Sequence, residues 1–419
     1  MSQQSTQVPS GCPHGAHPVA RKTSREGDRA TPAVDFDGQR WHVRSYDAAR
    51  QVLRATSATT QAGFNAEMVA RADRTREKPV LFADGDAHRG QRKAIARYFA
   101  PATVTSRYRE IMAARADELI AEIVAAGRAD LAEVTMRYSV AVAAQVVGLT
   151  NSDPDAMARR LESFFSLPHV TPREDVGRFG RIVDYLRSMR AMPPMLAFRR
   201  HDVMPAIAAR RAEPQQDVIS HLLAQGSSDE AILIECITYG AAGMVTTREF
   251  ISMAAWHLLE DEATRTRYLA ASEPQRLAIL DEILRLEPVA THLLRRTVEP
   301  LEITETDATG AKTTHTIPVG AIVDVHVRMA NADETAVGAE PLALFPQRQV
   351  PKGIRPEGLS FGDGAHRCPG NVIALQESDV FLQRLLRLPV HLASTPRLEW
   401  EDLIQAYAVR DIVLTCDAT

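Results

Sequence analysis

The segment Phe361-Gly362-Asp363-Gly364-Ala365-His366-Arg367-Cys368-Pro369-Gly370 places a single cysteine among three glycines, and a helical pattern follows at residues 371–388. Glycine permits positive φ and close backbone approach, so the segment can present the Cys368 sulfur on a tight turn with amide groups directed at it. The following helix brings its positive end near the sulfur. Both features favour the thiolate, which is the form that ligates metals.

The remaining cysteines narrow the choice of metal. The chain has four cysteines, widely scattered and with no C-x-x-C pair: Cys12, Cys236, Cys368 and Cys416. This disfavours a disulfide framework, a zinc ribbon, a dithiol redox pair and covalent haem attachment. A lone thiolate suits haem better than zinc, because zinc needs three or four protein ligands. A cysteine protease would need a positioned histidine, and His366 is too close in sequence to supply a familiar arrangement.

The ten-residue segment resembles the haem-binding loop of the cytochrome P-450 family, Phe-Gly-x-Gly-x-His/Arg-x-Cys-x-Gly, and every fixed position matches. The resemblance implies haem b (iron protoporphyrin IX) with Cys368 as the axial ligand and with Phe361 and His366 among the cofactor contacts. It also implies a mainly α fold with a small β portion, in which the haem lies between a long central helix and the cysteine loop.

A second motif is Glu282-Ile-Leu-Arg285, which is followed by Pro288-Val289. Residues at i and i+3 share a helix face, so this carboxylate and guanidinium can pair. Such pairs are common on helix surfaces and contribute little there. The resemblance, however, implies a buried structural pair joined by a later arginine, for which Arg348 is the matching candidate.

Cationic residues occur where the family contacts the haem carboxylates. Buried carboxylates require cationic donors, and His88 and Arg92 share one helix face in the segment Asp84-Gly85-Asp86-Ala87-His88-Arg89-Gly90-Gln91-Arg92. The resemblance implies that Arg295 and His366 complete the set. Arg296 is adjacent to Arg295 and stays open as the alternative ligand.

A long helix is expected from a capping box at Ser227 and Glu230 to about Glu260. Its segment Ala242-Gly243-Met244-Val245-Thr246-Thr247 is similar to the oxygen-binding pattern of the family. The resemblance implies that Gly243 leaves room beside the iron and that Thr246 holds oxygen and relays protons. Val245 occupies the position of the usual carboxylate, and Glu249 lies about 300° around the helix from the Val245 side chain, so it cannot simply replace that group.

Composition and charge set wider limits. The chain has 419 residues, a formal net charge of −4 and 24% charged residues, which is an ordinary globular balance without the basic excess of a nucleic-acid-binding protein. Residues 1–33 form a polar leader that we expect to be flexible, without the apolar core of a signal peptide or membrane anchor. Residues 34–419 are expected to form one catalytic domain in the cytoplasm, with no flavin or ferredoxin module.

The resemblance implies a monooxygenase that inserts one atom of O2 into a small, largely apolar substrate. Electrons would come from a separate ferredoxin and an NAD(P)H-dependent ferredoxin reductase. Substrate contacts are expected from residues 55–78, from the proline-rich region 151–216, and from Ala242, Ala290 and His292. Two alternatives stay open: a peroxide-using or atypical coupling or rearrangement enzyme, suggested by Val245, and a non-catalytic haem sensor, which the retained Thr246 disfavours.

Overall fold

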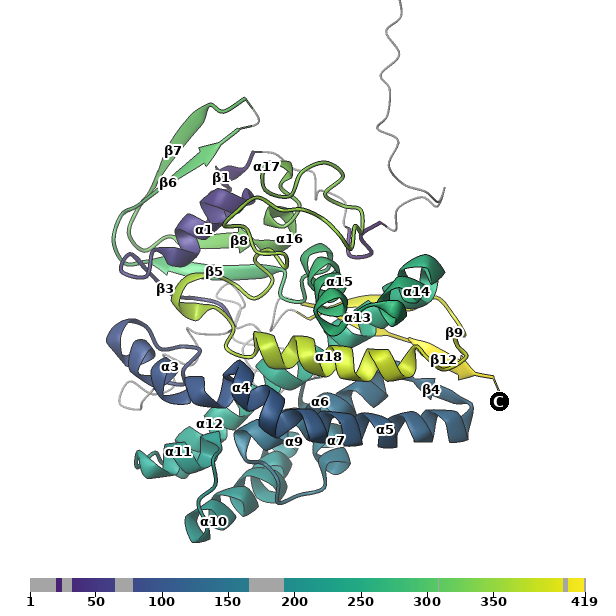
Figure 1. The fold of residues 1–419 in the computed structure, drawn as a ribbon. Coiled ribbons are helices and arrows are strands. Elements are labelled where there is room, and N and C mark those ends of the chain that lie inside the picture. Colours follow the sequence, from purple (N-terminus) through teal and green to yellow (C-terminus); the bar gives the residue numbers. More distant parts are fainter. Residues whose placement is uncertain are drawn as a thin grey trace, which may run out of the picture.

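The computed structural model describes residues 20–24, 32–64, 78–165, 192–307, 309–401 and 406–417. Helices dominate, the larger part of the β structure lies above the helical body, and a smaller sheet lies beside the helices near the C-terminus (Figure 1). The fold class is therefore mainly α with a small β portion, as expected from the sequence.

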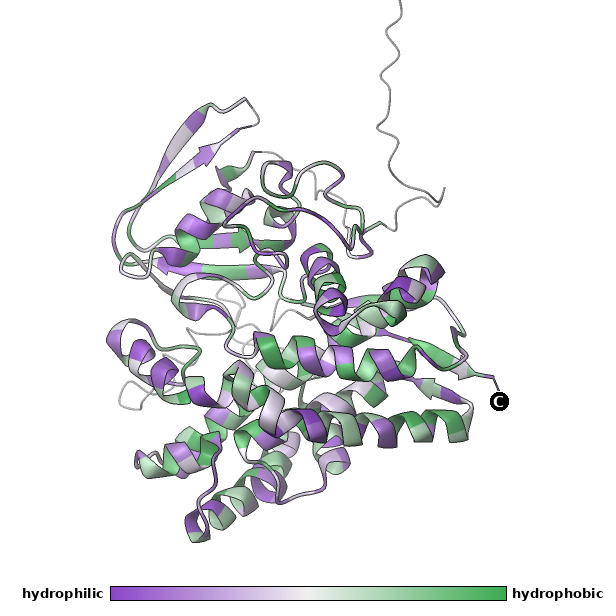
Figure 2. Cartoon of the chain, viewed as in Figure 1, coloured by the Kyte–Doolittle hydropathy of each residue, from purple (hydrophilic) through white to green (hydrophobic). Residues whose placement is uncertain are grey.

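The helical body contains α3 Gly85–Phe99, α4 Pro101–Thr103, η1 Val104–Tyr108, α5 Arg109–Ala126, α6 Leu131–Val147, α7 Pro154–Phe165, α9 Met192–Phe198, η3 Arg199–Val203, α10 Met204–Ala212, α11 Val218–Ala224, α12 Asp229–Tyr239, η4 Gly240–Val245, α13 Thr246–Glu260, α14 Glu262–Ala270, α15 Glu273–Leu286 and α18 Asn371–Leu385. Its core lies between α5, α6, α13, α15 and α18. The apolar faces of these helices point toward one another, which leaves the hydrophilic residues outward (Figure 2).

The β portion is organised around a five-stranded sheet in the order β1-β2-β8-β5-β3. Its strands are β1 Val34–Phe36, β2 Arg40–Val43, β8 Ile322–His326, β5 His292–Thr297 and β3 Thr59–Gln61. The β2–β8 pair is parallel and the other pairs are antiparallel. Helix α1, Tyr46–Arg54, packs on this sheet, and together they enclose a second, smaller apolar core.

The smaller elements complete the fold. Beside the sheet lie the short helices α16 Val327–Ala330, α17 Glu334–Val337 and η5 Gly364–His366. The two-stranded ribbons are β6 Leu301–Thr306 with β7 Lys312–Ile317, and β10 Arg397–Glu401 with β11 Ala406–Arg410. A three-stranded sheet contains β4 Arg128–Asp130, β12 Val413–Cys416 and β9 Val390–Leu392.

The central helix forms as three consecutive pieces, α12, η4 and α13, that run from Asp229 to Glu260 without a break. It begins one residue later than the sequence predicted, because Ser228 rather than Ser227 is the N-cap and accepts a hydrogen bond from the Ala231 amide. The middle piece is π-helical. Single π turns inside α-helices are frequent at functional sites.

Part of the predicted leader packs against the domain. Thr23 is buried, and its hydroxyl donates a 2.6 Å hydrogen bond to Glu287, while the Arg21 Nε donates to the Leu286 carbonyl at 2.7 Å. Glu287 also lies 3.0 Å from the fully buried His257. Residues 20–24 therefore satisfy buried polar groups of the helical body, whereas 1–19 and 25–31 lie outside the described residues.

Among the helices that the structure describes, none combines the length and the apolar composition that crossing a bilayer requires.

Candidate active site

The cysteine loop turns back on itself directly before α18. The Cys368 amide donates a 2.8 Å hydrogen bond to the Phe361 carbonyl, which closes the turn. Gly362 and Gly364 have φ of +69° and +67°, a conformation that favours glycine. A Cβ on Gly364 would overlap the Leu53 carbonyl oxygen of α1, so the close approach of loop and helix also requires glycine there.

Asp363 anchors this loop to its surroundings. Its carboxylate is buried and accepts hydrogen bonds from Arg54 Nε at 2.8 Å and from Arg50 Nε at 3.2 Å, both on α1. Arg355 adds an ion pair at 3.3 Å. Sequence reasoning treated residue 363 as a variable position. The signal that the sequence offers is a single carboxylate inside a glycine-rich segment.

The structure brings Glu282, Arg285 and Arg348 together. Arg285 donates from Nε to Glu282 Oε2 at 2.7 Å, and Arg348 donates from Nε to Glu282 Oε1 at 2.9 Å. Glu282 and Arg285 are both buried, with Arg285 fully so. The predicted set of three therefore forms one buried charge network.

Asn331 connects this network to the cysteine loop. Arg285 donates from Nη1 to the Asn331 carbonyl at 2.7 Å. The Asn331 side chain accepts from the Leu359 amide at 2.7 Å and donates to the Ser360 hydroxyl at 2.8 Å. These last two residues immediately precede Phe361. The ion-pair network thus fixes the position of the backbone from which the cysteine loop begins.

The groups around Cys368 shift the pKa of its thiol in opposite directions. Burial raises the pKa of Cys368, while the backbone amides of Gly370 and Asn371 and the guanidinium groups of Arg92 and Arg367 act to lower it. The amide groups expected from the glycine-rich turn are therefore directed at the sulfur. In the protein alone, however, burial prevails and the thiol form is favoured, contrary to the expectation from the turn and the helix dipole.

The predicted propionate contacts gather beside this loop. The rings of His88 and His366 stack with centroids 4.0 Å apart and an interplanar angle of 20°. His366 Nε2 lies 3.1 Å from Asp84 Oδ1. Burial lowers the pKa of His88 to about 4, with His366, Arg92 and Arg295 adding repulsion. Cations and imidazoles thus converge here around a single carboxylate, that of Asp84.

Arg295 and Arg296 point to opposite sides of β5. Arg295 is buried and donates a 2.6 Å hydrogen bond to Gln61 Oε1, within the electrostatic reach of Asp84. Arg296 instead donates to the Gly320 carbonyl at 2.9 Å. Because neighbouring strand residues face opposite ways, only Arg295 joins the histidine pair.

Arg92 links the cysteine loop to the central helix. It donates from Nη2 to the Arg367 carbonyl at 2.6 Å, next to Cys368. Its guanidinium also interacts electrostatically with the Cys368 thiol and with the Tyr239 hydroxyl at the end of α12. The cysteine loop and the start of the π-helical piece therefore approach the same part of α3.

The π-helical piece presents an open face. Ala242 is exposed although its helix is central, and a Cβ placed on Gly243 would meet nothing within 4 Å. Thr246 donates a 2.6 Å hydrogen bond back to the Ala242 carbonyl, which is the ordinary local bond of a helical threonine. Val245 is buried on another side of the helix.

Glu249 lies on the central helix, and Glu377 of α18 lies beside it. Glu249 accepts from the Val409 amide at 2.6 Å and from Arg410 at 2.9 Å, so it is held in a separate network, as its helical position led us to expect. Glu377 of α18 is buried and hydrogen-bonded to Thr247. Burial raises the pKa of Glu377 well above its usual value. Sequence reasoning missed Glu377, because its proximity to the central helix depends on helix packing.

The residues predicted to contact the substrate lie in different environments. Ala242 lies on the open helix face, and Ala290 forms an isolated bridge with Ala406. His292 instead bonds to Asp324 on the large sheet, 2.8 Å from Nδ1 to Oδ1. Much of the expected substrate region, 65–77 and 166–191, lies outside the described residues.

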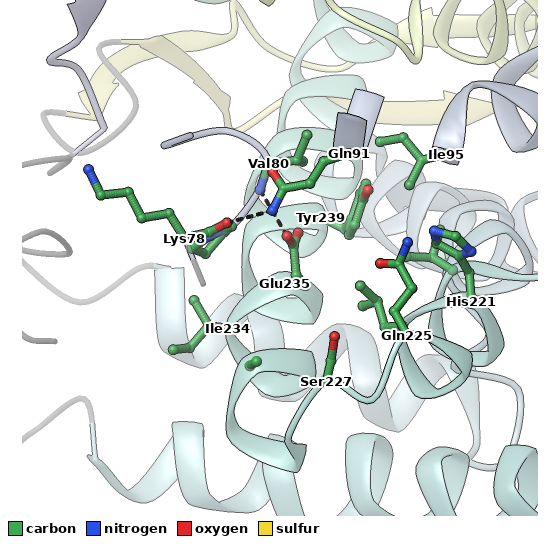
Figure 3. Close-up of a pocket in the computed structure, with 14 residues that line it drawn as sticks. Lys78, Val80, Gln91, Ile95, His221, Gln225, Ser227, Ile234, Glu235 and Tyr239 are labelled. Atoms are coloured by element: carbon green, nitrogen blue, oxygen red, sulfur yellow. Dashed lines mark hydrogen bonds between the residues drawn. The ribbon is translucent and has the colours of Figure 1, made fainter. Parts of the chain in front are cut away.

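A small pocket between α3, α11 and α12 lies next to the candidate site (Figure 3). Glu235 accepts from the Val80 amide at 2.8 Å, and Gln91 donates to the Lys78 carbonyl at 3.0 Å across its rim (Figure 3). Tyr239 also lines it, so the pocket adjoins the helix end that faces Arg92. None of the predicted site residues is among its described lining.

These residues fit a haem. Within the described residues, the buried Arg295 guanidinium has no carboxylate within 4 Å, and it lies beside two histidines that stack on each other. Such a cluster suits the two carboxylates of the cofactor. A lone thiol with amide groups directed at it and an open face at Gly243 complete what a thiolate-bound haem requires.

Fold and site together have the form of a cytochrome P-450, and comparisons with known proteins agree. The family model for cytochrome P450 matches residues 277–388. Erythromycin C-12 hydroxylase of Saccharopolyspora erythraea is 26% identical over 359 residues, covering 83% of this chain and 81% of that protein.

Solved structures give the same result at the level of the fold. CYP109B1 from Bacillus subtilis aligns with a TM-score of 0.71 and 22% identity, covering 93% of this chain and 97% of that one. CYP109E1 from Bacillus megaterium, solved with testosterone, aligns with a TM-score of 0.72 and 20% identity, covering 94% and 96%. The partial match to the family model, the curated relatives and the shared fold together support a monooxygenase of the cytochrome P-450 type, a class that uses a haem-iron cofactor.

Proposed function

We propose that the chain inserts one atom of O2 into a largely apolar organic substrate, with electrons from a separate ferredoxin and an NAD(P)H-dependent reductase. The cofactor is haem b, and residues 34–419 act as one catalytic domain. A cytoplasmic location is supported by the cysteines, which are too few and too scattered in the sequence for a disulfide framework. The observation that carries the proposal is that Arg92 of the cationic cluster contacts the cysteine loop beside Cys368 and also lies near Tyr239, directly before the helix piece that contains Gly243.

In this proposal Cys368 would hold the haem iron through its thiolate, and the haem would supply oxygen activation, which a thiolate ligand favours. His88, Arg92, Arg295 and His366 hold the haem carboxylates through charge-assisted hydrogen bonds. Phe361 contributes its carbonyl to the turn that positions Cys368. The buried charge network fixes the backbone that leads into this loop and takes no part in the chemistry. It consists of Glu282, Arg285 and Arg348.

Proton delivery depends on residues of the central helix. Thr246 directly follows the π-helical piece that contains Gly243, and its bond to the Ala242 carbonyl can be exchanged for one to bound water. Val245 offers no proton. Glu377 is hydrogen-bonded to Thr247, the neighbour of Thr246, and burial raises the pKa of Glu377 well above its usual value. We propose that Thr246 and ordered water carry protons to the reacting oxygen.

The substrate class is proposed from the relatives. One relative is named as an erythromycin hydroxylase, and one structural neighbour was solved with testosterone. Both names refer to bulky, ring-containing molecules that are largely aliphatic. Only 5% of the residues of this chain are aromatic, which agrees with a pocket lined by aliphatic side chains. We therefore propose a bulky aliphatic or polycyclic substrate.

The test begins with a spectral-shift screen, since a ligand that displaces iron-bound water changes the haem absorption. Ligands that shift the spectrum are then incubated with NAD(P)H, a ferredoxin and its reductase. The expected result is a product 16 mass units heavier that incorporates label from ¹⁸O2. Turnover with hydrogen peroxide alone, equal to that of the complete electron-transfer system, would instead favour the peroxide-using reading that the apolar Val245 suggests.

A further inference from the structure

Three histidines and an aspartate meet on one face of the large sheet. His42 lies on β2, Asp324 and His326 on β8, and His292 on β5. In the strand register, His42 is opposite Asp324 and His292 is opposite His326. Asp324 and His326 are two residues apart, so their side chains point to the same face. Arg295 is three residues from His292 and belongs to the opposite face.

Three of these side chains direct ligand atoms at a common point. His42 Nδ1 lies 2.8 Å from His326 Nε2, and the two nitrogens lie 4.0 and 3.8 Å from Asp324 Oδ2. Tetrahedral zinc with bonds of about 2.0–2.1 Å separates its ligand atoms by roughly 3.3 Å. The mean of the three observed separations is close to that value, so small rotations of the side chains are sufficient.

The surrounding contacts orient these ligands. His42 Nε2 lies 2.9 Å from Asp37 Oδ2, which leaves Nδ1 facing the cluster. His292 Nδ1 lies 2.8 Å from the other oxygen of Asp324, which leaves Oδ2 facing the histidines. A carboxylate behind a ligating histidine, and a hydrogen bond to a ligating carboxylate, are the usual supports of a metal site.

Burial and charge also favour a cation. The side chains of His42 and His326 are each 16% exposed and that of Asp324 is 8% exposed. A buried carboxylate is costly unless a cation pairs with it, so a bound metal ion would compensate the charge of Asp324.

We propose that His42, Asp324 and His326 form a binding site for a divalent transition-metal ion, with zinc as the natural candidate. Imidazole and carboxylate ligands suit zinc, and water or His292 can take the fourth position. The site joins β2 to β8, the one parallel pair of the sheet, and so fastens the β1–β2 hairpin to strands from the C-terminal half. It is independent of the haem proposal, because it lies on the sheet face opposite Arg295.

The experiment uses the full-length, tag-free, haem-loaded protein with zinc alone as the probe. Zinc is titrated in competition with a chromophoric chelator, and bound metal is counted per haem by elemental analysis. We expect one zinc ion per chain, with X-ray absorption showing nitrogen and oxygen ligands at about 2.0–2.1 Å. Zinc should also slow amide hydrogen exchange in the β1–β2 hairpin.

Single substitutions test how much each residue contributes to zinc binding. Asp37→Asn should weaken zinc binding about 10–100-fold, the usual cost of losing an outer support. His42→Asn and His326→Gln should each weaken it more than Asp37→Asn does. His391→Asn is the matched control and should leave zinc binding unchanged. The His391 imidazole is 62% exposed and lies on β9, which belongs to a different sheet from the cluster.

The N-terminal segment offers Cys12, His14 and His17 as competing ligands, so a Cys12→Ser/His14→Gln/His17→Gln variant is titrated in parallel. Retention of zinc in that variant, together with its loss in His326→Gln, supports the proposal. The proposal fails if zinc binding follows the N-terminal residues, if wild type and His326→Gln bind equally, or if no stoichiometric zinc is bound.

Discussion

The cysteine loop and the central helix both approach Arg92 of α3, but the loop and the π-helical piece of that helix are held in opposite ways. The loop is fixed by buried charges: Asp363 binds arginines of α1, and Asn331 connects the loop to Arg285. The helix piece from Gly240 to Val245 has an open face, and Thr246 bonds only to its own helix. The cysteine loop is held by buried charged groups. The π-helical piece has an open face, and the Thr246 hydroxyl that follows it can exchange its hydrogen bond for another.

This difference implies two classes of mutational effect. Changes on the loop side should affect whether the cofactor is held at all, because they leave buried charges without partners. Changes on the helix side should leave a folded, loaded protein and alter how the reaction proceeds. The predictions below test this division, beginning with the largest expected effect.

Replacing Cys368 by Ser or His should abolish the thiolate-type Soret band of the reduced carbon monoxide complex. The reason is that the other described cysteines, Cys236 and Cys416, lie in different parts of the fold, in α12 and β12. The measurement is the reduced carbon monoxide difference spectrum, with Cys416→Ser as the control that keeps the band. Survival of the band in the Cys368 variants would disprove the ligand assignment.

Glu282→Ala should give poorly folded or haem-free protein, since removing one partner of a buried ion pair costs about 3–5 kcal/mol. The readouts are the haem-to-protein absorbance ratio and the urea midpoint. Glu262→Ala is the matched control, because Glu262 forms an i,i+3 pair with Arg265 at 3.7 Å but is 76% exposed. If the two variants behave alike, the buried network does not hold the loop.

Thr246→Ala should keep the haem and the fold but release more hydrogen peroxide per NAD(P)H consumed. A positioned proton donor contributes about 10²–10⁴-fold, so product yield should fall clearly. Thr238→Ala is the control, because Thr238 makes the same local bond, to the Ile234 carbonyl at 2.9 Å, one piece earlier in the helix. Val245→Asp should lower peroxide release or leave it unchanged.

Unaltered product yield and peroxide release in Thr246→Ala would contradict the relay. Proton delivery by the substrate, or peroxide-driven chemistry, would then become the better explanation.

Asp281→Asn should produce the smallest effect, a pH-dependent gain in stability. Burial, then the charge of Glu357, raises the pKa of Asp281 to about 7 in the folded protein. A raised carboxyl pKa means that the folded state binds more protons than the unfolded state, so wild type loses stability as pH rises from about 4 to about 7. The variant should therefore have a higher urea midpoint than wild type at pH 8.

The two midpoints should converge near pH 4, where the native carboxyl is protonated. A difference that is independent of pH would show that the substitution acts through packing.

The sequence predicted best those features that depend on residues close together in the chain. The helix over Tyr46–Arg54 and the helix ends at Gly127 and Gly148 follow from local patterns and glycine conformation, and the structure contains them. The cysteine turn and the grouping of Glu282 with Arg348 were predictable because the motif residues themselves carry the information.

Other features depend on contacts that no local pattern encodes. Asp363 meets α1 across 309 residues of sequence, and Glu377 reaches Thr247 only because α18 packs on α13. His292 was expected near the substrate, yet the strand register turns it toward Asp324. The upward shift in the pKa of Cys368 was also missed, because the desolvation of a buried thiol cannot be read from the sequence around it.

The contact between residues 20–24 and the helical body has a practical consequence for anyone who shortens this protein. Glu287 accepts hydrogen bonds from Thr23 and lies against His257, so cutting the chain at the first strand would remove a partner from a buried carboxylate. Expression clones that begin near residue 33 should therefore give lower yields and melt earlier than clones that begin at residue 19. A purification tag is best separated from Arg21 by the natural leader or by a spacer of similar length.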